Sequence, residues 1–157
     1  NHTLAEISII VSIGKINSRR HVTANKFGVA HEDVFNYIDV LTSAADASSL
    51  RSRTISNNIA NIDTPHYKRQ DVSFSANLQQ ALKNSKYETL DQKVASLNIK
   101  KLHGVVYTDN DAYSYRLDGN NVDVDTENVY MAENQLMYQG LTKSLSAEFK
   151  HFQAVSK

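Results

Sequence analysis

The sequence has no cysteine, a single proline (Pro65) and five glycines in 157 residues. Without cysteine, the chain cannot form disulfides, a thiolate nucleophile or a cysteine-type zinc site. So few glycines leave little material for a phosphate-binding loop, and no P-loop, GxGxxG or GxSxG pattern occurs. These absences argue against an enzyme and against a nucleotide cofactor.

An excess of charge of one sign is also missing. Lys plus Arg and Asp plus Glu both number 17, so the formal net charge is zero. Because no overall basic field attracts phosphate backbones, nucleic acid is not an expected partner. The longest strongly apolar run, Ile7–Ile13, is far shorter than the roughly 20 residues that cross a bilayer, so no transmembrane segment is expected.

The histidines give no sign of a metal centre. All six are scattered, no HExxH pattern occurs, and no two lie four residues apart on a predicted helix. The acidic segment between residues 109 and 125 leaves one alternative open, because carboxylate oxygens are hard ligands. A calcium-binding or hydrolytic exported protein would use its aspartates: Asp109, Asp111, Asp118, Asp123 and Asp125. The segment lacks the spacing of an EF-hand loop, and turns and a helix cap account for these aspartates more simply.

A long helix is predicted over residues 34–62, which contain neither glycine nor proline. Apolar and small residues recur there in steps of three and four: Ile38, Leu41, Ala45, Ser48, Ser52, Ile55, Ile59 and Ile62. The stripe is narrow and half of it is small, which suits close approach to another helix. Residues 1–33 show no sustained periodicity and are left unassigned.

A second long helix is predicted over residues 126–157, with Asp125 or Thr126 available to cap its first turn. Its apolar stripe consists of Val129, Ala132, Leu136, Tyr138, Leu141, Leu145, Phe149, Phe152 and Val155. Gly140 lies inside this helix at a cost of roughly 1 kcal/mol relative to alanine, which indicates close packing against its backbone.

The middle of the chain, residues 63–125, is polar and partly flexible in this interpretation. It holds one short helix near residues 77–83 and strands at Val105–Thr108 and Ala112–Leu117, with Asp118-Gly119 as a hairpin signal. The predicted fold is therefore mainly α. It is an elongated, coiled-coil-like hairpin of long N- and C-terminal helices with a small β-hairpin or loop insertion between them.

The first helix should stop before Pro65, because proline lacks an N–H donor and pushes the preceding residue out of the α region. The short side chains of Asn61 and Asp63 can bind the backbone groups that the helix end leaves free. The sequence "NNIANIDTPHYKRQD" thus reads as a helix terminus, a tight turn and an exposed charged loop.

Two separated segments resemble one family. "NNIANIDTPHYKRQDVSF" resembles the Asn-x-Ala-Asn-x-x-Thr-x-Gly-Tyr signature of bacterial flagellar rod and hook axial proteins, and more closely that of the B-type proximal rod proteins. "LDGNNVDVDTENVYMAENQLMYQGLTKSLSAEFKHF" resembles the closing segment of the same family, including Asp-Gly-Asn-x-Val-Asp. The chain departs from the pattern at His66, where the family has glycine, so the turn either differs or is strained there.

The resemblance implies a structural subunit of the proximal rod of the flagellar basal body, which transmits motor torque and is not an enzyme. It implies passage through the flagellar type III export apparatus and partners among other rod proteins, basal-body and export components and further copies of the chain. Another axial subunit, of the rod or hook, is the alternative. We expect the helix contacts to involve Ile38, Leu41, Ile55, Ile59, Leu141, Leu145, Phe149 and Phe152. We expect the turn to be fixed by Asn57, Asn58, Asn61, Thr64, Pro65 and Tyr67.

Overall fold

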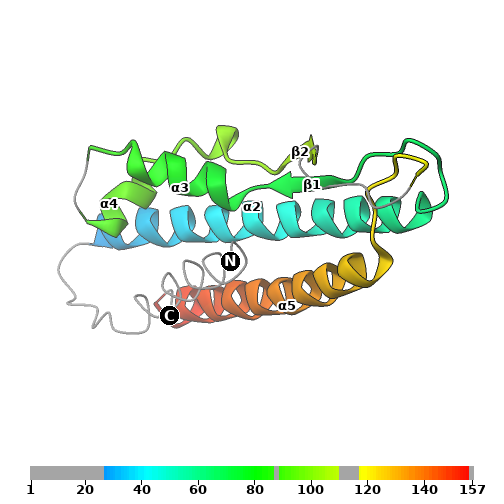
Figure 1. The fold of residues 1–157 in the computed structure, drawn as a ribbon. Coiled ribbons are helices and arrows are strands. Elements are labelled where there is room, and N and C mark those ends of the chain that lie inside the picture. Colours follow the sequence, from blue (N-terminus) through cyan, green and yellow to red (C-terminus); the bar gives the residue numbers. More distant parts are fainter. Residues whose placement is uncertain (1–26, 87–88, 110–116, 156–157) are drawn as a thin grey trace.

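The computed structural model describes residues 27–86, 89–109 and 117–155. Two long helices lie side by side, and a smaller layer of short elements covers one side of the first helix (Figure 1). The elements in chain order are α2 (Phe27–Ala60), β1 (Gln70–Ser73), α3 (Ser75–Lys83), α4 (Leu90–Ala95), η1 (Ile99–Lys101), β2 (Val105–Thr108) and α5 (Val124–Val155). The prediction of a mainly helical hairpin with a small insertion is confirmed. None of the described helices combines the length and apolar character needed to cross a membrane.

The two long helices are antiparallel. Ser48 of α2 bonds to Asn134 of α5, while the ring of Phe35 near the start of α2 lies 5.5 Å from that of Phe152 near the end of α5. The helix α2 starts at Phe27, seven residues before the predicted start, and residues 1–26 lie outside the described part. The first turn of α5 is capped by Asp123, whose carboxylate accepts bonds from the Asp125 N–H and the Thr126 hydroxyl. The predicted cap at Asp125 or Thr126 is therefore wrong by two or three residues.

The face of α5 that meets α2 agrees only in part with the predicted apolar stripe, of which Leu141, Leu145 and Phe152 pack on this side. Its buried positions repeat every seven residues, as in a coiled coil: Glu127, Asn134, Leu141 and Glu148. Val129 and Leu136, which belong to the predicted stripe, lie on the outside and are 56% and 69% exposed. The pattern fails in part because three of the four seam positions are polar, so hydrophobicity alone does not reveal them.

Small and polar residues let the helices approach in the middle of the seam. The hydroxyl of Ser48 donates to Asn134 Oδ1 at 3.0 Å, and Asn134 Nδ2 donates to the Ser48 carbonyl at 2.9 Å and to Ser52 Oγ at 2.7 Å. Asn134 is buried, and its amide is satisfied entirely by α2. This set of bonds fixes the register between the two helices, because a shift of one turn would leave a buried amide without partners.

The insertion has a hydrophobic core of its own with α2. Tyr37 and Val40 of α2 pack with Leu78 of α3, Val94 of α4 and Leu102 after η1. The helix α3 confirms the short helix predicted near residues 77–83, but α4 was not predicted. The sequence did not predict this core, because the middle segment is mostly polar and its few apolar residues are spread over three short elements.

A smaller apolar cluster joins α5 to α2. Leu41, Ala44 and Leu141 form it, with Met137 and Leu145 packed against it. Gly140, predicted to mark close packing, has no atom within 4 Å of the position that a Cβ would take, apart from the helix's own backbone nearby. The close packing predicted at Gly140 is therefore not found within the described part of the chain.

The sheet has two antiparallel strands, in which Gln70 pairs with Thr108 and Ser73 with Val105. The strand predicted at Val105–Thr108 is confirmed, but it pairs with β1, which the sequence did not reveal, instead of the next strand along the chain. Residues 110–116, which hold most of the other predicted strand, lie outside the described part. Leu117 and Asp118 form a turn, which is consistent with the turn signal at Asp118-Gly119.

Leu141→Ala tests which face of α5 is the seam. Leu141 is 1% exposed, so its truncation should lower the free energy of unfolding by about 2–5 kcal/mol. The matched control is Leu136→Ala on the same helix, where exposure predicts a change within about 0.5 kcal/mol. Urea unfolding followed by circular dichroism measures both, and equal losses in the two variants would contradict the assignment.

Candidate functional site

The two sequence motifs meet at the end of the hairpin where α2 stops and α5 begins (Figure 1). Asn120 is 1% exposed, and its Nδ2 lies 2.9–3.0 Å from the carbonyl oxygens of Asn61, Ile62 and Thr64. These three carbonyls belong to the turn that follows α2, and those of Asn61 and Thr64 also accept from the N–H groups of Thr64 and Tyr67. A side chain from just before α5 therefore binds the turn after α2 and holds the two motifs together.

Two more asparagines fasten β1 in this region. Asn58 of α2 forms a closed pair with the backbone of Gln70, accepting from its N–H at 3.0 Å and donating to its carbonyl at 2.7 Å. Asn121 accepts from the Arg69 N–H at 2.7 Å and donates to the Asp109 carbonyl at 2.9 Å. The Asn121 amide thus replaces a direct hydrogen bond from the Arg69 N–H to the Asp109 carbonyl, while the Asp109 N–H still donates to the Arg69 carbonyl. We call Asn58, Asn120 and Asn121 the asparagine junction.

The turn between α2 and β1 is closed by His66. Its φ is 60°, in the left-handed region that favours glycine, and its N–H donates to the Asp118 carbonyl at 3.0 Å. Gly119 also has a positive φ, and a Cβ there would lie 3.1 Å from the His66 ring. The turn therefore keeps the conformation that a glycine would adopt, and the alternative of a strained His66 holds.

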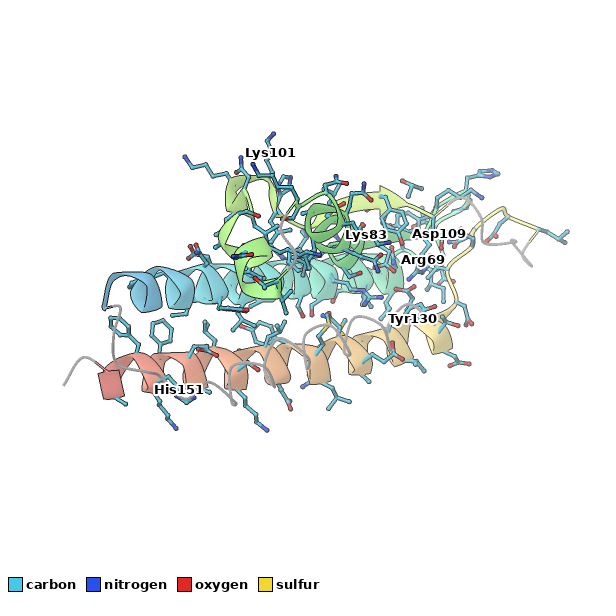
Figure 2. The ribbon with its side chains drawn as sticks, turned by 90° about the vertical axis from the view of Figure 1, so that its left-hand side faces the viewer. Arg69, Lys83, Lys101, Asp109, Tyr130 and His151 are labelled. Carbon is cyan, nitrogen blue, oxygen red and sulfur yellow. The ribbon has the colours of Figure 1, made fainter. Side chains whose placement is uncertain are left out.

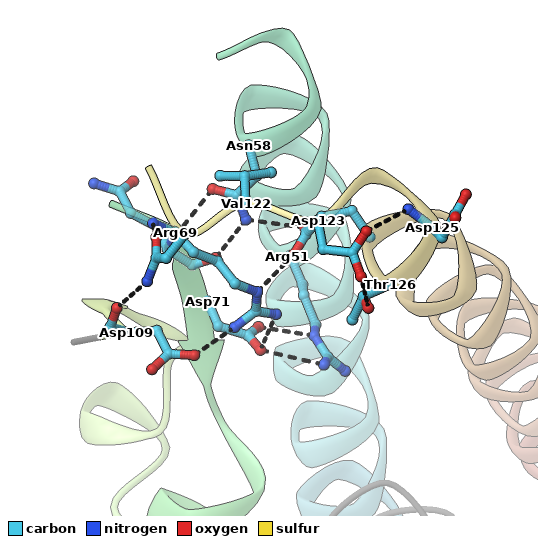
Figure 3. A network of polar contacts seen from close by, with 12 residues as sticks. Arg51, Asn58, Arg69, Asp71, Asp109, Val122, Asp123, Asp125 and Thr126 are labelled. Atoms are coloured by element: carbon cyan, nitrogen blue, oxygen red, sulfur yellow. Dashed lines mark hydrogen bonds and ion pairs between the residues drawn. The ribbon is translucent and has the colours of Figure 1, made fainter. Parts of the chain in front are cut away.

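Beneath the junction lies a buried network of charges (Figure 3). The Arg69 guanidinium binds Glu127, Asp71 and Asp109, so it joins α5, β1 and the end of β2. Arg51 of α2 binds the same Asp71 carboxylate at 3.0 Å. Figure 2 shows Arg69, Asp109 and Tyr130 grouped on one side of the molecule. Thus one side chain joins α5, β1 and the residue after β2, and Asp71 links it through Arg51 to α2.

An aromatic ring completes the network. The Tyr130 ring lies 4.9 Å from the Arg69 guanidinium carbon and 5.8 Å from that of Arg51, within the range of cation–π attraction. Glu127 is fully buried and also accepts a bond from Asn58 Nδ2 at 3.0 Å. Each charge of the network is thus met by an opposite charge, a dipole or a ring, which is what a buried ion cluster requires.

The network shifts the pKa values of its members. Burial favours the neutral form of Asp71, but Arg51, the Val72 N–H and Arg69 outweigh it and hold the pKa of Asp71 below its ordinary value. Burial, aided by the carboxylate of Glu127, raises the pKa of Tyr67, whose hydroxyl bonds to Asn58. The carboxylate of Asp71 therefore stays ionised and stabilises the fold at neutral pH.

The geometry gives these residues structural roles. Among the described residues, no three His, Asp or Glu side chains are grouped so that they could hold a metal ion. Of the aspartates in the calcium alternative, Asp109 binds Arg69, Asp118 accepts from the Asn120 N–H, and Asp123 caps α5. A cavity beside Ser48, Arg51 and Leu141 measures about 30 Å³, room for about one water molecule. The calcium alternative therefore gains no support from the described residues.

The residues predicted to fix the turn fall into two groups. Tyr67 donates to Asn58 of the asparagine junction and Thr64 donates to Asn61 within the turn, whereas the side chains of Asn57 and Pro65 lie exposed at the surface. Of the predicted helix contacts, Ile38, Leu41, Ile55 and Leu141 are buried inside the chain, Ile59, Leu145 and Phe152 are half-buried, and Phe149 is 49% exposed. Sequence reasoning missed Asn120, Arg69 and Glu127, although the first lies in the Asp-Gly-Asn motif.

The lowered pKa of Asp71 predicts an acid-sensitive part of the stability. Because the folded-state pKa lies below the unfolded value of about 3.9, the contribution is complete above that value and disappears as the pH falls through the folded pKa. Asp71→Asn should therefore be less stable than the parent at pH 7 and lose less on acidification. Urea unfolding between neutral pH and about pH 3 measures this, with Asp39→Asn, an exposed site on α2, as the control. Parallel pH curves for parent and Asp71→Asn would contradict it.

The left-handed turn predicts the effect of replacing His66. Both His66→Gly and His66→Ala remove the ring beside Gly119, but only alanine retains the Cβ that makes a positive φ costly. His66→Gly should be more stable than His66→Ala by about 1 kcal/mol in thermal unfolding. Equal stability of the two variants would mean that the turn can adopt a negative φ at no cost.

Comparison with known proteins agrees with this architecture. Residues 38–68 match the family model of the flagella basal body rod protein, a segment that covers much of α2, the turn and the entry to β1. The flagellar basal body rod protein FlgB of Bacillus subtilis is 34% identical over 118 residues, which cover 75% of this chain and 91% of the relative. That of Borrelia hermsii is 34% identical over 145 residues, covering 85% and 99%, and that of Escherichia coli K12 is 30% identical over 114 residues, covering 68% and 83%. The chain therefore belongs to the family of the flagellar basal body rod protein FlgB.

Proposed function

We propose that the chain is a structural subunit of the proximal rod of the flagellar basal body, and that it transmits motor torque without catalysing a reaction. The observation that carries the proposal is the conjunction of family membership with a helical hairpin that exposes the large apolar side chains of Val129 and Leu136 on the outer side of α5. The B-type subunit is favoured over another axial protein because the relatives named above are all FlgB proteins. In this role the chain is located in the flagellar rod after passage through the flagellar type III export apparatus.

The outer face of α5 is the surface best suited to contact a neighbouring subunit. Val129 and Leu136, seven residues apart on this face, are 56% and 69% exposed, while Tyr138 and Phe149 on another side of the helix are 43% and 49% exposed. Large apolar side chains exposed along one helix mark a surface that packs against another protein. Gly140, with open space at its Cβ position, lets a partner helix approach this part of α5 closely.

The predicted helix contacts divide accordingly between two tasks. Leu41, Leu141 and Leu145 hold α5 on α2 within one subunit. Phe149 extends outward and is available to a partner, such as another rod protein or a further copy of the chain. The remaining partners in this proposal are basal-body and export components. The asparagine junction keeps the hairpin closed so that both helices are presented in a fixed register.

The test is complementation in source cells that lack the gene, examined by electron microscopy of their flagella. We expect loss of rod, hook and filament together, and recovery with the parental gene. Leu136→Asp should fail to restore flagella, because it places a charge on the outer face without touching the seam. Asn128→Asp, also exposed on α5, is the matched control and should restore them.

Normal flagella in the deletion strain would overturn the proposed function. If the deletion removes flagella but Leu136→Asp restores them, the rod function stands and the outer face of α5 is not the contact. Circular dichroism of purified Leu136→Asp must match the parent, so that misfolding does not imitate a lost contact.

A further inference from the structure

The strand β2 has an edge that is open in the described part of the structure. The direction of its backbone groups follows from the strand register and from one hydrogen bond, in which the Asp109 N–H donates to the carbonyl of Arg69, the pair next to Gln70 and Thr108. Because the backbone groups of a strand alternate in direction, Val105 and Tyr107 also point toward β1. The backbone groups of Gly104, Val106 and Thr108 therefore point away from β1.

Apart from its short length, the edge of β2 has none of the usual protections of an edge strand within the described residues. Natural sheets guard such edges with short strands, with proline, with lysine in the strand or with a covering element. Residues 105–108 read Val-Val-Tyr-Thr, with no charge and no proline, and Val105, Val106 and Tyr107 are 46%, 41% and 48% exposed. An exposed apolar edge of this kind is a template for pairing with another strand.

We infer that β2 pairs antiparallel with β2 of a second copy of the chain, with Val106 on the twofold axis. In this register Val106 faces itself and Gly104 faces Thr108 of the partner copy, so every outward-pointing backbone group of the strand is paired. The two strands form about six hydrogen bonds. The two-stranded sheet of each copy becomes half of a four-stranded sheet across the dimer.

The residues that flank the strand are complementary in the same register. Val105 faces Tyr107 of the other copy, a β-branched and aromatic pair of the kind that stabilises neighbouring strands. His103, which is exposed, faces Asp109, whose carboxylate lies at the opposite end of the strand. If Val105 or Tyr107 lay on the twofold axis, His103 would no longer face Asp109. These flanking residues therefore favour the register with Val106 on the axis.

The dimer is a state of the free subunit and is independent of the proposed function. A twofold contact is complete with two copies and cannot extend into a filament, whereas a rod requires contacts that repeat. The paired edge is small, at the low end of interface sizes, so the dimer dissociates readily. Pairing covers the exposed edge of β2 before the subunit meets its assembly partners.

The absence of cysteine provides a direct test of the register. Val106→Cys places two thiols in a hydrogen-bonded antiparallel pair, where the Cα atoms lie about 5.5 Å apart, within the range that a disulfide bridges. Thr108→Cys is the matched control, because its thiols lie on opposite sides of the axis and too far apart. Under mild oxidation of the full chain, Val106→Cys should form covalent dimers at least roughly tenfold faster. Equal rates in the two variants would overturn the register.

Sedimentation of the parent chain tests the dimer itself. The parent should become dimeric as its concentration rises over roughly 5–500 μM, and Val106→Pro should weaken dimerisation at least about tenfold. Proline removes the outward N–H of residue 106 and is tolerated on an edge strand. Val106→Thr retains that N–H and should dimerise like the parent. A parent that stays monomeric throughout, or a Val106→Pro variant that dimerises equally well, would overturn the inference.

Discussion

The fold depends on the ion pair between Arg69 and Glu127. Glu127 is fully buried at the start of α5, and Arg69 lies just before β1 in the segment that leaves α2. An ionised carboxylate without a partner in this position would cost several kcal/mol. The start of α5 must therefore return to the segment that leaves α2, as it does in the antiparallel hairpin. The asparagine junction and the remaining ion pairs surround this contact. The asparagine side chains form hydrogen bonds with the backbone groups that lie around it.

The polar character of the seam explains how the hairpin divides its surfaces. Asn134 and Glu127 occupy positions where a coiled coil would carry leucine or isoleucine, and each is bonded to α2. Such positions contribute less to stability than apolar ones but specify register and orientation, since any other alignment leaves a buried group unpaired. The apolar residues displaced from the seam, such as Leu136, lie outside and remain available for contacts between subunits. Under the proposed function, orientation within the subunit and adhesion between subunits use opposite faces of α5.

Much of the architecture could be predicted because it follows from local signals. The two long helices follow from periodicity and the lack of breakers, and the end of α2 follows from Pro65 and the asparagines before it. The position of Asn120 could not be predicted from spacing, because its three acceptors lie more than fifty residues away in the sequence. From local patterns, Glu127 would be predicted to be a solvent-exposed acid in the first turn of a helix. Its burial depends on the ion pair with Arg69, which only the fold brings close. The resemblance indicated which segments matter without indicating that they touch.

The insertion was harder to predict than the two long helices, and the pairing of β1 with β2 shows why. The partners are separated by 31 residues that hold two helices, and one bond of their ladder is replaced by the amide of Asn121. A search for neighbouring strands therefore selects the wrong partner. Asn121 follows Asn120, whose amide binds the turn after α2. The junction therefore also fixes the end of β2, because Asn121 donates to the carbonyl of Asp109, the residue after that strand. Only the side of β2 that faces β1 is held in this way, and the backbone groups on its other side point away from β1, toward the edge at which we infer pairing with a second copy.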